Sequence, residues 1–190
     1  MTKEALRKIY LHKRLALSEV EYIQLSQQLC DLFFASIDLS FIRVLHIFLP
    51  IEKKKEPNTW LIIDRIRREF PHIRLSISRV HNQTGILENF YFEGLHQLQK
   101  SKWDIWEPKQ GIPTESEKID MVLVPLLIFD KQGHRVGYGK GFYDAFLKTC
   151  RKDCRKIGLS FFEPVDRIDD LNQYDTPLNF CINTKGKHQF

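Results

Sequence analysis

The sequence predicts an α/β fold in which a mainly parallel sheet carries helices on both faces. Short apolar runs bounded by proline or glycine alternate with segments of helical periodicity. The clearest unit is residues 121–147, where an apolar run, a glycine-containing loop and an amphipathic run follow one another. Such alternation is typical of parallel strands joined by crossover helices, which cover the sheet from both sides.

Two helices are predicted at the start of the chain. In residues 3–16, Leu6 and Ile9 recur at helical spacing among basic residues. Ser18 and Glu21 have capping-box spacing, so a second helix is predicted to begin there and to run to about residue 37. An apolar stripe along this second segment predicts that it packs on the sheet.

The remaining chain is predicted to alternate strands with one further long helix. Asn58 is expected to cap a helix over residues 59–69, which is followed by Pro71. Residues 93–118 are polar and contain two prolines, so a loop-rich excursion is expected there. Strands are predicted over the apolar segments 42–49, 73–78, 87–92, 121–124, 156–161 and 180–183.

Three loops are expected to surround a ligand site. In open α/β sheets, ligands bind beyond the carboxyl ends of the strands. Residues 50–57, 130–141 and 161–175 each follow a predicted strand or lie between a strand and a helix. We therefore expect these three loops to converge.

Length and composition favour one domain spanning residues 1–190. The net charge of +5 comes from basic residues spread along the chain, which favours a small anionic substrate over nucleic acid. No apolar run reaches about 18 residues, and the charged first segment lacks the apolar core of a signal peptide, so no membrane partner is expected. Four cysteines without metal-ligand spacing predict reduced thiols. We expect a cytoplasmic monomer.

The loop within residues 121–147 has the composition of a phosphate-binding loop. Gly137, Gly139 and Gly141 stand at alternate positions, which leaves backbone N–H groups uncovered and tolerates positive φ. Arg135 and Lys140 add positive charge before a predicted helix start, where an anion is favoured. The spacing fits neither a P-loop nor a dinucleotide fingerprint, so a glycine-rich turn with a structural role stays open.

The stretch FDKQGHRVGYGKGFYDAFL, residues 129–147, resembles the signature of the 5-formyltetrahydrofolate cyclo-ligase family. Weaker similarity extends from residue 3 to about residue 184. Leu126 stands where the family usually has glycine, and Phe142 where it often has tyrosine. The resemblance implies a three-layer fold of the NagB/RpiA/CoA-transferase-like type. It also implies an ATP- and Mg²⁺-dependent ligase that cyclises 5-formyltetrahydrofolate to 5,10-methenyltetrahydrofolate and releases ADP and phosphate.

The resemblance also implies which residues bind ATP. Lys3 and Arg7 match a basic pair of the family, although their spacing alone would indicate a solvated helix face. Lys140 and Arg135 are implied as the catalytic residues that offset charge on the transferring phosphoryl group. The implied ATP-binding set is Lys3, Arg7, Arg135, Val136, Gly137, Tyr138, Gly139, Lys140, Gly141, Phe142 and Tyr143.

A folate site is implied by four residues. Glu56, in the segment EPNT, would alone be taken for a surface residue. Trp103 matches a family tryptophan and could stack on a pteridine ring, whereas its spacing from Trp106 alone would indicate core packing. The implied substrate-binding set is Ile51, Glu56, Trp103 and Tyr138.

Asp144 and Asp175 are implied as magnesium ligands. Magnesium favours one or two carboxylates together with phosphate oxygens and water. From the sequence alone, Asp144 could instead stabilise a helix end, and Asp175 could cap a turn before Pro177.

Two other classes of function stay open. One is a sugar-phosphate isomerase or acyl-transfer relative on a similar sheet, which needs no ATP. The other is a non-catalytic nucleotide-binding protein. The ATP-dependent appearance of a methenyl product separates the cyclo-ligase from both.

Overall fold

The computed structural model describes residues 1–81, 83–101 and 104–190. Within these ranges the main sheet has seven strands in the order β11-β10-β9-β6-β1-β2-β3. The strands are β1 Val44–His46, β2 Arg74–Val80, β3 Leu87–Tyr91, β6 Met121–Val124, β9 Arg155–Leu159, β10 Phe180–Asn183 and β11 Gly186–Gln189.

The middle of this sheet is parallel and its two edges are antiparallel. Strands β10, β9, β6, β1 and β2 pair in parallel with one another. The edge strands β3 and β11 pair antiparallel with β2 and β10. The prediction of a mainly parallel sheet is confirmed, whereas β11 was not predicted.

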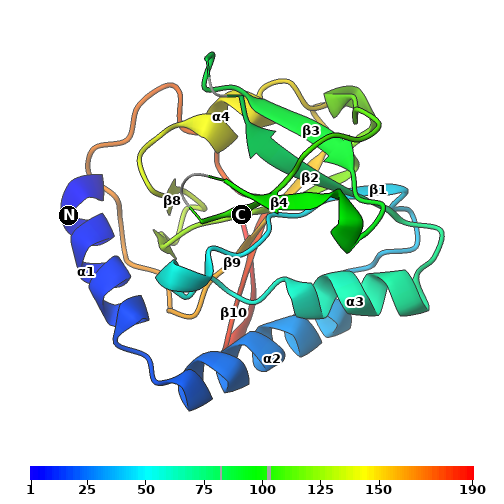
Figure 1. Cartoon of the computed structure of the whole chain (residues 1–190). Helices are drawn as coiled ribbons and strands as arrows, with labels where there is room; N and C mark the ends of the chain where they lie inside the picture. Colours follow the sequence, from blue (N-terminus) through cyan, green and yellow to red (C-terminus); the bar gives the residue numbers. More distant parts are fainter. Residues whose placement is uncertain (82, 102–103) are drawn as a thin grey trace.

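Four helices flank the sheet in the described part of the chain (Figure 1). They are α1 Lys3–Leu15, α2 Glu19–Ser36, α3 Trp60–Glu69 and α4 Phe142–Leu147. The capping box predicted for α2 is present, because Glu21 N donates to Ser18 Oγ at 3.2 Å and Ser18 N donates to Glu21 Oε2 at 2.7 Å. By its backbone α3 is capped at Thr59, one residue later than predicted, but it is the Asn58 side chain that accepts the N–H of Trp60, at 3.2 Å.

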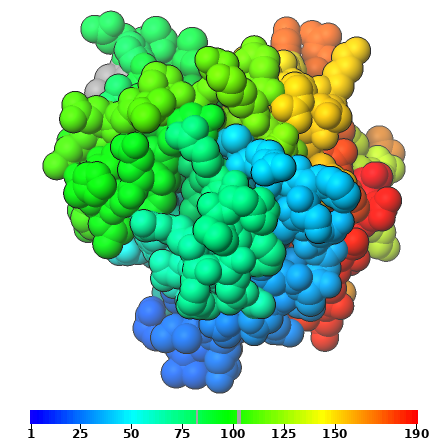
Figure 2. Space-filling model, turned by 90° about the vertical axis from the view of Figure 1, so that its right-hand side faces the viewer, coloured from blue at the N-terminus to red at the C-terminus, as the bar shows by residue number. Residues whose placement is uncertain are grey.

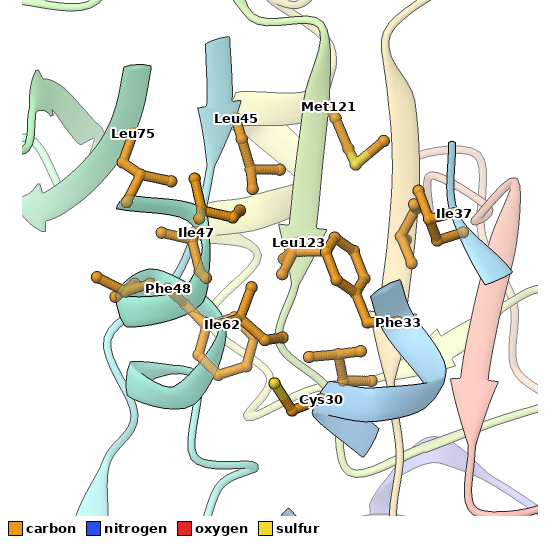
Figure 3. Packing of buried hydrophobic residues seen from close by; sticks show 14 of the residues in the cluster. Cys30, Phe33, Ile37, Leu45, Ile47, Phe48, Ile62, Leu75, Met121 and Leu123 are labelled. Atoms are coloured by element: carbon orange, nitrogen blue, oxygen red, sulfur yellow. The ribbon is translucent and has the colours of Figure 1, made fainter. Parts of the chain in front are cut away.

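The core is arranged in three layers. Figure 3 shows Phe33 of α2 and Ile62 of α3 pointing toward Leu45 and Leu123 of the sheet. Because side chains alternate along a strand, Val122 and Val124 face the opposite side, where they pack in one cluster with Phe146 of α4. Figure 1 shows α2 and α3 on one side of the sheet and α4 on the other. The three-layer prediction is therefore confirmed.

The segment expected to be a plain loop between β6 and α4 contains a hairpin. Its strands are β7 Ile128–Phe129 and β8 Arg135–Val136. The buried Asp130 supports the turn, because its Oδ1 accepts N–H groups of Gln132 at 3.0 Å and His134 at 2.9 Å. α1 packs on this hairpin through Leu6. The hairpin therefore ties the first helix to the glycine loop that follows it.

The 93–118 segment is also more ordered than predicted. It contains two short strands that pair antiparallel, β4 Leu98–Lys100 and β5 Trp106–Pro108. Three-residue 3-10 helices lie at 95–97 and 116–118, and a third, Glu52–Lys54, follows β1. Figure 2 shows this segment, in green, beside α3.

The four cysteines are free thiols, and three of them are buried. No helix among the described residues is both long and apolar enough to cross a bilayer.

Candidate functional site

Two of the expected loops meet at the carboxyl ends of the parallel strands. The Tyr138 hydroxyl, in the glycine loop, donates to Glu56 Oε1 at 2.8 Å, and Glu56 lies in the loop after β1. Glu56 Oε2 accepts the N–H of Ile51 at 2.7 Å. Three of the four residues predicted to bind folate are therefore connected by hydrogen bonds, while Trp103 lies outside the described residues.

Glu56 is not the surface residue that its sequence context suggested. It is 2% exposed, and burial raises the pKa of its carboxyl. The charge of Arg14 and the hydrogen bonds from Ile51 and Tyr138 act in the opposite direction on that pKa. A buried, hydrogen-bonded carboxyl of this kind is suited to binding a specific polar ligand group.

The first helix brings two of its basic side chains to the site. Lys3 Nζ forms an ion pair with Asp175. Arg7 Nε donates to the carbonyl of Gly137 at 2.9 Å. The guanidinium also lies over Gly139, where a Cβ would be 3.0 Å from Nη2 and φ is +83°. Only glycine fits there without strain. A glycine at position 139 therefore allows the Arg7 side chain of α1 to lie directly on the loop.

Arg135 of β8 and Asp144 of α4 lie on either side of the glycine loop and form an ion pair of 2.8 Å. Arg135 Nη1 also donates to the carbonyl of Thr176 at 2.6 Å, and the N–H of Thr176 donates to Asp144 Oδ1 at 3.1 Å. Asp144 thus lies against the residue that follows Asp175. The third expected loop therefore joins the other two.

The two carboxylates predicted to bind metal are near each other, and each also holds a cationic side chain. Among the described residues, neither Asp144 Oδ2 nor Asp175 Oδ1 has a hydrogen-bond partner. In the same ranges no group of three or more metal-ligating side chains occurs. Two free carboxylate oxygens fit a magnesium ion whose other ligands are phosphate oxygens and water.

Lys140 differs from the other basic residues of the site. It is exposed and makes no hydrogen bond or ion pair within the described ranges. Gly141 next to it is left-handed with φ +70°, at the start of α4. α4 has only six residues, so its dipole is short, and the full positive charges of the site are those of its basic side chains.

The side chains of Val136 and Tyr143, two residues of the implied ATP-binding set, contact other parts of the protein. Val136 is buried in the cluster of Leu6 and Ile128, and its carbonyl accepts the N–H of Leu127 at 2.8 Å. The Tyr143 hydroxyl lies 3.3 Å from Nε2 of His46, and burial raises the pKa of this tyrosine. The Val136 side chain and the Tyr143 hydroxyl therefore have partners within the protein, and a contact of either residue with ATP stays a prediction.

Three site residues were missed by sequence reasoning. Arg14 of α1 donates to the Tyr138 hydroxyl and, through Nη1, to the carbonyl of Leu126 at 3.1 Å. The Lys54 ammonium lies 3.9 Å from the centroid of the Tyr138 ring. His46 is fully buried in β1, and desolvation lowers its pKa to about 3. A signal existed for Arg14, because residues at 3, 7 and 14 fall on one helical stripe.

The model of the 5-formyltetrahydrofolate cyclo-ligase family matches residues 1–178. The chain belongs to this family. A 5-formyltetrahydrofolate cyclo-ligase from Mycoplasma pneumoniae is 30% identical over 191 residues, covering 96% of this chain and 99% of that protein. One from Mycoplasma genitalium is 26% identical, covering 94% and 97%. The chain is accordingly an enzyme of the ligase class.

Two solved structures of cyclo-ligase relatives agree with the fold. The 5,10-methenyltetrahydrofolate synthetase from Aquifex aeolicus has a TM-score of 0.84 at 26% identity, covering 100% of this chain and 93% of that chain. The synthetase from Mycoplasma pneumoniae has a TM-score of 0.77 at 28% identity, covering 97% and 99%. The α/β class inferred from the sequence is thereby confirmed.

The two departures from the family signature have clear positions in the structure. Leu126 is buried, and a Cβ on Gly158 would lie 2.6 Å from its Cδ2. The leucine side chain therefore fills the space above the glycine of β9 after β6 has ended. The half-buried Phe142 begins α4 and would contact a Cβ on Gly85 at 3.6 Å.

Proposed function

We propose that the protein catalyses the ATP- and Mg²⁺-dependent cyclisation of 5-formyltetrahydrofolate to 5,10-methenyltetrahydrofolate, with release of ADP and phosphate. Membership of the family supports the reaction. The observation that carries the proposal is the hydrogen bond from Tyr138 to Glu56, because it joins the loop assigned to ATP to the residue assigned to folate. Such adjacency is what transfer between two bound substrates needs.

The chemistry explains why ATP is required. The oxygen of an N-formyl group is a poor leaving group, so the γ-phosphoryl group is first transferred from ATP to that oxygen and ADP is released. N10 of the same folate then attacks the formyl carbon and loses its proton. Phosphate leaves with the former formyl oxygen, which gives the methenyl product. The protein contributes positioning and charge neutralisation, as in phosphoryl transfer generally.

The described side chains suit these tasks. Lys140 has no partner in the described ranges, so its ammonium is free to meet a phosphate. Arg7 is held over the glycine loop, and Lys3 and Arg135 lie beside the acidic pair. Asp144 and Asp175 would hold Mg²⁺, which when bound offsets the charge of the phosphates. Glu56, Ile51 and Tyr138 would bind folate, and Trp103 stays a predicted folate contact.

The decisive experiment measures product and ADP together. The protein is mixed with 5-formyltetrahydrofolate and Mg-ATP while the methenyl absorbance and ADP are followed. We expect equal amounts of both, and neither when folate or ATP is left out. ATP hydrolysis without folate, or ATP binding without product, would overturn the proposal in favour of another nucleotide-binding function. That the protein is a cytoplasmic monomer with one domain stays a prediction.

A further inference from the structure

Arg14 is a buried cation that the proposed mechanism does not use. It lies near the end of α1 and is 1% exposed. Its Nη1 donates to the carbonyl of Leu126 at 3.1 Å, and its Nη2 donates to the Tyr138 hydroxyl. The guanidinium also lies on the Tyr138 ring, with Cζ 5.6 Å from the centroid. One side chain thus contacts both the segment that follows β6 and the glycine loop.

This cation is buried without a direct counter-charge. Arg14 forms no ion pair with any described residue, and its Nε is buried without a hydrogen-bond partner there. A buried charge left in this state is unfavourable for folding. A methionine or leucine would fill such a helix position at lower cost, so stability alone does not account for the arginine.

Arg14, Tyr138 and Glu56 form a chain of hydrogen bonds in which each group donates to the next. Because the Tyr138 hydroxyl accepts from Arg14, its own proton is directed to Glu56 Oε1, 2.8 Å away. Glu56 Oε2 is fixed by the N–H of Ile51. The chain of donors therefore ends on a carboxylate whose orientation is set at both oxygens.

We propose that Arg14 is a positioning residue that fixes the Tyr138 hydroxyl and, through it, the Glu56 carboxylate that receives folate. The proposal rests on the proposed function, because it takes Glu56 as a folate ligand. The charge of Arg14 gives it a second effect. It opposes the rise that burial causes in the pKa of Glu56, so it keeps the carboxylate ionised at lower pH.

A double-mutant cycle tests whether Arg14 acts through Tyr138. Arg14→Lys keeps the charge but loses the forked guanidinium, and Tyr138→Phe removes the hydroxyl. The Kd of 5-formyltetrahydrofolate is measured by calorimetry for the wild type, both single variants and the double variant. Each single change should weaken binding up to about tenfold, the worth of one hydrogen bond. The Kd of the double variant should be no higher than that of the weaker-binding single variant, because both changes break the same chain of hydrogen bonds. Effects that multiply would overturn the proposal.

The pH dependence of folate binding separates positioning from a purely structural role. In Arg14→Met the charge is gone, so the pKa of Glu56 rises and the loss of binding on acidification should begin at higher pH. Arg14→Lys should restore the wild-type pH profile. Asp120→Asn is the matched control for lost stability. It breaks a 2.8 Å pair with Arg151 at the amino-terminal edge of the sheet, and it should leave folate affinity and its pH profile unchanged.

These experiments distinguish failure of the Arg14 proposal from failure of the proposed reaction. Folate binding without a methenyl product would contradict the proposed reaction and still leave the cycle measurable. An unshifted pH profile in Arg14→Met would assign Arg14 to structure alone. If Arg14→Met does not fold, the cycle built on Arg14→Lys decides. A wild type that binds no folate would overturn both proposals.

Discussion

Arg135 Nη2 and Asp144 Oδ1 lie 2.8 Å apart, and both side chains also bond to the backbone of Thr176. The Arg135 side chain is 6% exposed, so Asp144 supplies the counter-charge to a largely buried guanidinium. The pair joins the strand before the glycine loop to the helix after it and to the loop of Asp175. Asp144, which is predicted to bind magnesium, thus also has a structural role.

Asp144→Asn should therefore lower stability and raise the magnesium requirement. Loss of the ion pair leaves a buried guanidinium with a weaker partner, which should cost about 1–3 kcal/mol in the free energy of unfolding. An amide is also a weaker magnesium ligand than a carboxylate. The rate is measured against free Mg²⁺, with Asp120→Asn as the control because Asp120 also pairs with an arginine at 2.8 Å. Superimposed magnesium curves for Asp144→Asn and wild type would leave Asp144 only the structural role.

Lys140→Met should reduce use of ATP without changing stability. Lys140 is exposed and has no partner in the described ranges, so its loss costs the folded state nothing measurable. A charge-assisted contact with phosphate is worth about 1.5–3 kcal/mol, so kcat/KM for ATP should fall roughly tenfold to a hundredfold. The exposed Lys152 is at a turn before β9, and Lys152→Met serves as the control. Equal kcat/KM values for the two variants would remove Lys140 from the site.

His46 should make the protein less stable in mild acid. Its folded pKa is about 3, below the ordinary value of 6.5, because it is desolvated. Between these values the unfolded state binds more protons, so the contribution of His46 to stability is fully present above 6.5 and is lost as pH falls. The loss is about 1.4 kcal/mol per pH unit.

The test compares wild type with His46→Leu in urea unfolding at pH 7 and pH 5. The difference in unfolding free energy between the two proteins should shift by about 2 kcal/mol in favour of the variant at the lower pH. A difference that stays constant with pH would show that folding does not lower the pKa of His46.

Trp103→Ala should weaken folate binding and leave ATP binding unchanged. An aromatic stack on a flat ring is worth about 0.5–1.5 kcal/mol beyond the area that it buries. Calorimetric titrations with each ligand measure both affinities on one sample. A lower melting temperature with normal folate affinity would place Trp103 in the core, as its spacing from Trp106 alone suggests.

Much of the fold was predictable because its signals are local. The capping box of α2 and the apolar segments around β6, β9 and β10 specify their elements within a few residues. The hairpin of β7 and β8 was missed because its strands have two residues each, too few for periodicity to show. Edge strand β11 was missed because its burial is partial and its residues are polar.

The site was predictable in part, for a physical reason. A glycine loop with flanking charges is visible in sequence, and so were Lys3 and Arg7 through family resemblance. Arg14 was passed over because a basic residue on a helix is usually solvated, and only the packing of α1 on the hairpin shows that it is buried. Long-range partners such as Glu56 and Tyr138, 82 positions apart, leave no local pattern.

The ion pair between Lys3 and Asp175 spans 172 positions of the chain. During synthesis the first helix leaves the ribosome long before its partner loop exists. Until about residue 176 has emerged, Lys3 and Asp175 lack each other, and Arg135 lacks its contact with Thr176. A nascent chain stalled anywhere earlier therefore lacks the contacts that hold the proposed ATP and magnesium site together, and we expect it to bind these ligands more weakly than the finished chain does.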